Sequence, residues 1–313
     1  MHVGVQIGEG SPLSWDRWRH IVAMTERLGF RSLFRSDHYY NGYQKDSIDI
    51  FLSFVLAGAE SSRIRFGSLV SPVTFREPVN IGRMAQQLDA LSGGRFVLGL
   101  GAGWYGEEHE RFGLAFPPVG ERMDRLEEAI LLMRELWHSS DGHYSGKYYS
   151  LAGTDSQPHP PAGRPPVLLG GAGARRTLKL VAQYADEWNA PARRIEAYKE
   201  AVVNLERHCD AVDRDPSTIR RSVLMFTDLA PDASMGATAL QRFIDMTNPG
   251  KTIEELERAG RGPWRGSVEE LVDFLGQLSE LGVEEVMFDH LCHEVDTIPE
   301  WIAADLAPRL SRL

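Results

Sequence analysis

Two residues capable of acid–base chemistry, Asp37 and His38, stand directly after an apolar run at residues 32–34 that is typical of a buried strand. An unperturbed imidazole has a pKa near 6.5, so His38 can exchange a proton near neutrality, and the carboxylate beside it could hold or accept one. The pair predicts proton handling at a bound ligand. The alternative is that His38 only hydrogen-bonds the loop at residues 39–44 and shapes a pocket.

A second segment, LLGGAGARR at residues 168–176, combines a strand end, a turn of small residues and the start of a helix. The free N–H groups and the positive dipole end of such a helix bind anions. Arg175 and Arg176 would add positive charge in the first turn. The segment predicts a phosphate site, the alternative being a glycine-rich turn with solvated arginines.

Two further segments follow predicted strands. In SLVSPVTFR at residues 68–76, hydroxyl residues and a proline suit a kinked backbone that presents polar groups to a ligand, or else an ordinary turn. GAGWYG at residues 101–106 matches the spacing of a dinucleotide-binding loop. The acid that such a loop requires about 20 residues later would fall inside an amphipathic helix, at Glu121–Asp124. The glycines therefore indicate a sharp turn or a close approach to another ligand.

Composition excludes several classes of protein. The net charge of -10 argues against a nucleic-acid or anionic-membrane surface, and no apolar run approaches the ~20 residues of a membrane span. Two cysteines and ten histidines without an H-E-x-x-H motif predict no metal site and no disulfide framework. The N-terminus lacks the pattern of an export signal, so we expect a soluble, cytoplasmic enzyme.

Short apolar runs alternate with helical patterns along the chain, which favours one parallel-stranded α/β domain over residues 1–313. Strands are predicted at residues 3–7, 32–34, 64–70, 96–99, 167–169, 187–189, 222–226 and 285–288. Eight is the number that a (β/α)8 TIM-like barrel requires. Apolar stripes predict helices at residues 15–28, 78–91, 123–137, 195–212 and 268–281, with Ser14 and Ser267 as caps.

The longest connections follow strands, at residues 37–49, 101–118 and 230–266. In a barrel these lie at the C-terminal rim, where ligands bind. The segment at residues 141–166 follows a helix and is better explained as a hairpin excursion. We therefore expect long insertions at the rim that carries the site.

Four motifs occur in order: LGFRSLFRSDH at residues 28–38, IRFGSLVSPVTFR at 64–76, LSGGRFVLGLGAGW at 91–104 and ADEWNAP at 185–191. Together they resemble the bacterial-luciferase-like superfamily and, within it, the oxidoreductases that depend on the deazaflavin coenzyme F420. The resemblance is dense up to about Asp215 and thinner beyond.

The resemblance implies a TIM-like barrel with the cofactor at its C-terminal rim. Asp37 and His38 would lie beside the deazaflavin ring, His38 as the catalytic residue, and Ser68–Leu69 would form a non-prolyl cis peptide behind the ring. It also implies cofactor contacts from Ser71, Gly101, Ala102, Gly103 and Glu107 and, for the phosphate, from Gly171, Ala172, Gly173 and Ala174.

One departure from the family pattern concerns the proton donor. The branch that oxidises a sugar phosphate has a glutamate where this chain has Trp104, and the residues that grip the phosphate have no convincing match at residues 230–266. The expected function is hydride transfer between F420 and a small organic substrate. The alternatives are an FMNH2-dependent monooxygenase and a non-catalytic flavin- or deazaflavin-binding protein. The resemblance also implies a homodimer.

Overall fold

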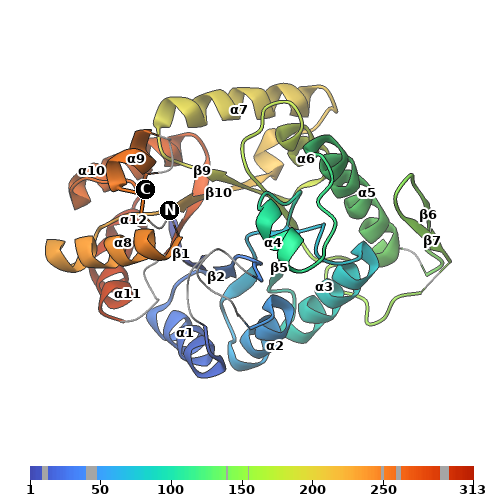
Figure 1. Ribbon diagram of the computed structural model, residues 1–313, viewed down its shortest axis with the longest axis horizontal. Coiled ribbons are helices and arrows are strands. Elements are labelled where there is room, and N and C mark those ends of the chain that lie inside the picture. The colour runs from blue at the N-terminus through green and yellow to red at the C-terminus, as the bar shows by residue number, and fades with distance from the viewer. Residues whose placement is uncertain are drawn as a thin grey trace.

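A closed barrel of parallel strands forms the centre of the molecule (Figure 1). The computed structural model describes residues 1–8, 13–39, 48–138, 140–153, 155–247, 250–258, 262–289 and 296–313. Within them the barrel strands are, in chain order, β1 (His2–Ile7), β2 (Ser32–Arg35), β3 (Arg65–Ser68), β5 (Phe96–Gly101), β8 (Val167–Gly170), β9 (Glu187–Pro191), β10 (Arg220–Met225) and β11 (Val283–Phe288). Pairing of β3 with β5 and of β1 with β11 closes the ring. The predicted eight-stranded TIM-like barrel is confirmed, and no strand end differs from its prediction by more than two residues.

Helices surround the barrel as the apolar stripes predict (Figure 1). The outer helices are α1 (Trp15–Leu28), α2 (Ile50–Glu60), α3 (Pro78–Ser92), α5 (Val119–His138), α6 (Thr177–Tyr184), α7 (Ile195–Asp210) and α10 (Val268–Glu280). Ser14 caps α1, and Ser267 with Glu270 forms a capping box on α10. Trp15 shares the apolar stripe of α1 with the buried Trp18, yet it is exposed, because it is the first residue of the helix.

The excursions from this frame are short helices and one hairpin. They comprise α4 (Gly106–Arg111), α8 (Ala233–Thr247), α9 (Ile253–Arg258), the predicted hairpin of β6 (His143–Ser145) with β7 (Ser150–Ala152), and a C-terminal run of α11 (Thr297–Trp301), a turn of π-helix (Ile302–Leu306) and α12 (Ala307–Leu310). None of the helices in the described part of the chain is long and apolar enough to cross a membrane.

Buried charges close the N-terminal end of the barrel. Arg220 lies 3.2 Å from the Glu285 carboxylate, which also accepts a 2.5 Å hydrogen bond from Ser32. Arg65 pairs with Glu187 beside them. Burial raises the pKa of Glu187 although the two arginines oppose that shift, so the carboxylate is strongly desolvated. This end of a TIM barrel serves stability, and the cluster acts as a charged plug.

Another buried carboxylate, that of Asp89, has no arginine or hydrogen-bond donor beside it among the described residues. Asp89 of α3 is 1% exposed, and neither of its carboxylate oxygens has a hydrogen-bond partner among the described residues. Burial raises the pKa of Asp89 to about 6. The folded state therefore binds more protons than the unfolded state between about pH 4 and 6, and stability falls as the pH rises through that window.

We expect Asp89→Asn, which resembles the protonated acid, to stabilise the protein by about 1–2 kcal/mol near pH 8 and by little near pH 4. Urea denaturation at the two pH values measures the difference. An equal stabilisation at both pH values would show that the Asp89 carboxyl group keeps the same protonation state between them.

Candidate active site

His38 and Glu108 form a buried pair at the C-terminal rim. His38 follows β2, its side chain is 12% exposed, and its Nδ1 lies 2.8 Å from Oε2 of Glu108. Glu108 lies on α4, is fully buried, and accepts the backbone N–H of Tyr39 with its other oxygen. A buried carboxylate on Nδ1 orients the ring and stabilises the imidazolium form. The sequence analysis predicted Glu107 as a site residue and gave no role to Glu108.

Asp37 takes part in a different network. Its buried carboxylate accepts a hydrogen bond from the Ser71 hydroxyl and is held by Arg76 at 2.5 Å. Arg76 also reaches Asp49, the N-cap of α2, at 3.0 Å. The charge of Asp37 is thereby matched, so Asp37 and Ser71 brace the rim behind His38. Arg76 is a second site residue to which the sequence analysis gave no role.

The non-prolyl cis peptide lies between Leu69 and Val70, so the prediction for Ser68–Leu69 is wrong by one residue. The Ser68 hydroxyl clips β3 to β5 by bonding both the carbonyl and the N–H of Gly99, at 2.8 and 3.0 Å. The Leu69 N–H still donates to the carbonyl of Arg35 at 2.7 Å. The Leu69 N–H thus continues the pairing with β2, and the chain pairs with β5 again at β4 (Ser71–Pro72).

Glycines around the cis peptide make room for the Val70 side chain. A Cβ on Gly101 would lie 2.7 Å from Val70, and one on Gly170 would lie 3.1 Å from it. These contacts join the segments that follow β3, β5 and β8 at one end of the barrel. The small size of Gly101 therefore serves packing between strands, whatever it contributes to a ligand.

The turn after β5 presents an aromatic side chain to the solvent. Gly103 adopts a φ of 79°, and Ala102 before it is half-buried. Trp104 is 62% exposed, and its ring lies edge-on to His38 at 5.9 Å. Glu107 is exposed and paired with Arg111 at 2.7 Å, so the inward carboxylate of the two adjacent glutamates is Glu108. The cofactor contact of Glu107 stays a prediction.

The turn after β8 is anchored and open. The Gly171 N–H donates to Asn189, and its carbonyl accepts from the Trp188 indole at 2.7 Å. Ala172, Gly173 and Ala174 are exposed. A Cβ on Gly173 would lie 2.9 Å from the Thr177 hydroxyl, so glycine permits this close approach to the start of α6. The phosphate contact of this turn stays a prediction.

The two arginines of this segment lie elsewhere than predicted. Helix α6 begins at Thr177, so Arg175 and Arg176 precede its first turn. Arg176 pairs with Asp124 of α5 and donates to the carbonyl of Gly120 at 2.8 Å, because α5 packs beside this turn. Arg176 therefore joins α5 to the turn, and the exposed Arg175 is the cation that remains near the open loop.

All the predicted site residues lie at the last residues of β3 and β5 or on the segments that follow β2, β3, β5 and β8, at the same end of the barrel. Figure 1 shows α4, which carries Glu107 and Glu108, in the middle of the ring of outer helices. The structure describes His38 and Tyr39, but residues 40–44 of the loop considered as the alternative partner of His38 lie outside the described part of the chain. In that part no three His, Cys, Asp or Glu side chains are grouped to hold a metal ion.

Comparisons with known proteins identify the family of the chain and support its barrel fold. The family model for luciferase-like monooxygenases matches residues 1–297. The chain is 32% identical over 267 residues to the F420-dependent hydroxymycolic acid dehydrogenase of Mycobacterium tuberculosis, covering 80% of this chain and 71% of that relative. It is 27% identical over 315 residues to the F420-dependent glucose-6-phosphate dehydrogenase of the same species, covering 94% and 93%. A structure of an F420-dependent secondary alcohol dehydrogenase with an F420-acetone adduct has a TM-score of 0.83 at 19% identity, covering 99% and 98%.

Proposed function

The chain belongs to the luciferase-like monooxygenase family, and on that premise we propose that it is an oxidoreductase that transfers a hydride between coenzyme F420 and a small organic substrate. The observation that carries the proposal is the His38–Glu108 pair, which lies at the rim where the exposed glycine turn after β8 also lies. F420 dependence is supported by two relatives whose names include it.

The residues fit the cofactor at both ends. The turn from Gly171 to Ala174 would hold its phosphate, and Gly101 to Gly103 would line the path towards the ring. The chemistry that F420 supplies when bound is two-electron hydride transfer, so the protein is left with positioning and proton management. His38 would hold or release a proton at Nε2, on the opposite side of the ring from Glu108.

The chain has no acidic side chain at position 104, and Glu108 supplies a carboxylate at the same rim. A carboxylate at position 104 would act on the substrate directly, whereas the Glu108 carboxylate contacts Nδ1 of His38, at 2.8 Å, and accepts the backbone N–H of Tyr39. We infer that Glu108 is a positioning residue, and that His38 is the group that exchanges the proton.

An FMNH2-dependent monooxygenase is the second candidate, favoured by the description of the family model. Titration of the purified protein with F420 and with FMN, followed by fluorescence, distinguishes the two. We expect F420 to bind more tightly and to be reduced or oxidised in the presence of substrate. Tighter FMN binding with oxygen consumption would support the monooxygenase, and F420 binding without turnover of any alcohol or carbonyl compound would support a binding protein.

The phosphate turn gives a specific prediction. We expect Gly173→Glu to weaken F420 binding by about 10- to 150-fold, from steric filling and like-charge repulsion. Fluorescence titration measures the dissociation constant. Gly276→Glu adds the same charge on α10, where a Cβ meets only Leu313, and should leave binding unchanged. Equal dissociation constants for wild type and a folded Gly173→Glu variant would place the phosphate elsewhere.

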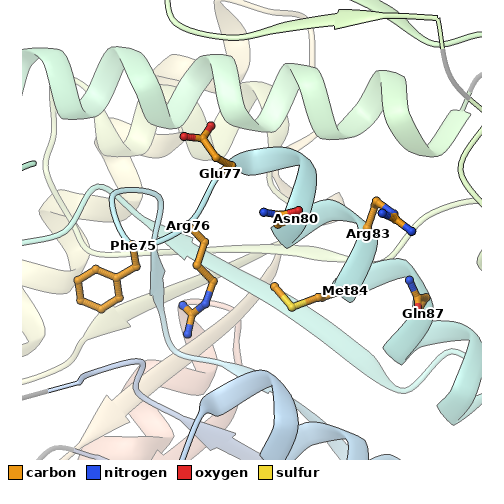
Figure 2. A pocket seen from close by; sticks show the side chains of 7 residues that line it. All are labelled: Phe75, Arg76, Glu77, Asn80, Arg83, Met84 and Gln87. Carbon is orange, nitrogen blue, oxygen red and sulfur yellow. The ribbon is translucent and has the colours of Figure 1, made fainter. Parts of the chain in front are cut away.

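We further propose that the protein forms a homodimer through α2 and α3. Helix α2 is apolar on its outer face as well as its inner one, with Leu52 60% and Val55 48% exposed. The adjoining groove has a volume of about 640 Å³ and is lined in part by Arg76, Arg83 and Met84. Figure 2 shows the Met84 side chain of α3 pointing toward Arg76. A helix that is hydrophobic all round is normally buried, and a second copy offers the same surface.

We expect light scattering to give twice the chain mass of 35.0 kDa. The double variant Leu52→Glu, Val55→Glu should give the monomer mass, because it places charges in the apolar interface. Val203→Glu, at an exposed apolar position on α7, is the matched control and should remain dimeric. A monomeric wild type would contradict the proposal.

A further inference from the structure

We propose that Trp104 and Tyr105 form a platform that binds the uncharged, apolar part of the substrate, an alkyl or aryl group attached to the reacting alcohol or carbonyl carbon. The inference rests on the proposed function and names its substrate class. Trp104 is one of the most exposed large apolar side chains described, and it lies directly beside His38. Exposed apolar surface of this kind marks binding sites.

The platform is rigid, although it faces the solvent. The Trp104 and Tyr105 rings stack at 5.2 Å with an interplanar angle of 27°. The Tyr105 hydroxyl donates to Glu107 at 3.0 Å, and the Tyr105 carbonyl accepts from Nδ1 of His109 at 2.7 Å. The indole is therefore exposed on an anchored turn, so a ligand would bind it without a large ordering cost.

His109 supplies most of this anchoring. It is 1% exposed, and its Nε2 bonds the Thr74 hydroxyl at 2.7 Å on the segment that follows β4 (Ser71–Pro72). The same hydroxyl would lie 2.9 Å from a Cβ on Gly103, so this turn requires glycine directly before Trp104. The turns after β4 and β5 thus hold one another, and they fix the indole relative to His38.

The charges near the platform favour a neutral ligand. The Glu107 carboxylate is paired with Arg111, and the buried Glu108 carboxylate is paired with His38. These charges are matched within the protein, and the platform itself presents two uncharged rings. Arg193, Arg194 and Arg258 line a separate groove of about 740 Å³ between β9 and α9, and neither platform residue belongs to its lining. Binding at that groove would therefore be seen as a preference for anionic substrates.

The test uses the enzyme with bound F420 and neutral secondary alcohols whose alkyl chain lengthens stepwise from isopropanol. For wild type we expect kcat/KM to rise by about two- to fourfold per added methylene over the first few. Trp104→Ala should lose most of that rise, whereas Trp104→Phe should retain it. Trp15→Ala, which removes an exposed tryptophan from α1, should behave as wild type.

A binding experiment separates this inference from the proposed function. Saturation-transfer NMR with a neutral alkyl aryl ketone needs no turnover, and the ketone signal should be present for wild type and lost in Trp104→Ala. Ketone binding that depends on Trp104 without any F420 turnover would keep the platform and overturn the proposed function. An unchanged chain-length dependence in Trp104→Ala, or a higher kcat/KM for a carboxylate or phosphate ester of the same chain length, would overturn the platform.

Discussion

His38→Ala is expected to lower the rate of the chemical step by roughly a hundredfold or more, while F420 affinity stays within a few-fold, because the variant loses the acid–base group. The geometry behind this expectation is the 2.8 Å contact with Glu108, which holds the ring in one orientation at the rim. Single-turnover kinetics with bound, reduced F420 measures the step directly. His143→Ala, in the exposed hairpin, is the matched control.

Glu108→Gln sharpens the same test. The amide keeps the shape but loses the charge that stabilises an imidazolium, and its single acceptor oxygen can serve only one of the two groups that the carboxylate contacts, Nδ1 of His38 and the Tyr39 N–H. We expect an intermediate rate and a pH–rate profile displaced to lower pH, since the charged form of His38 becomes less favourable. A His38→Ala variant that keeps the rate of hydride transfer and loses only F420 affinity would assign His38 to cofactor binding.

Glu285→Ala is expected to destabilise the protein by about 3–5 kcal/mol, because it leaves buried arginines without their counter-charge. Glu285 is fully buried, lies 3.2 Å from Arg220 and 3.9 Å from Arg65, and accepts the Ser32 hydroxyl. Urea denaturation at neutral pH measures the loss. The neighbouring Glu284 is half-exposed and reaches Arg220 at 3.9 Å, so Glu284→Ala should cost less than about 1 kcal/mol.

Similarly small losses of unfolding free energy for Glu285→Ala and Glu284→Ala would show that water enters the N-terminal end of the barrel and screens the cluster. Activity per folded molecule should be unchanged in both, since the cluster lies at the end of the barrel opposite His38.

The barrel itself could be predicted because its signals are local. Most strands are short, largely apolar runs buried on both faces, and the caps at Ser14 and Ser267 act within one helical turn. Parallel strands all end at the same rim, so the segments that carry His38, Gly101 and Gly171 had to meet there. The place of the site therefore follows from the order of elements along the chain.

The partners within the site could not be predicted, because they join distant segments. Glu107 and Glu108 are adjacent and chemically identical, and only the packing of α4 against the segment after β2, 70 residues earlier, buries one and exposes the other. Likewise, a sequence that contains Asp37 and Arg76 does not show that the arginine neutralises the carboxylate. Helix periodicity cannot distinguish such pairs.

The amino-acid sequence by itself determined the architecture of this protein, the rim that carries the site, and the types of residue available there, since these follow from hydrophobic periodicity and chain order. Only the tertiary structure decided that Glu108 faces His38, that the cis peptide lies between Leu69 and Val70, that α6 begins at Thr177, and that Trp104 is exposed. These outcomes depend on how side chains from separate strands fill one shared space, and no single segment contains that information.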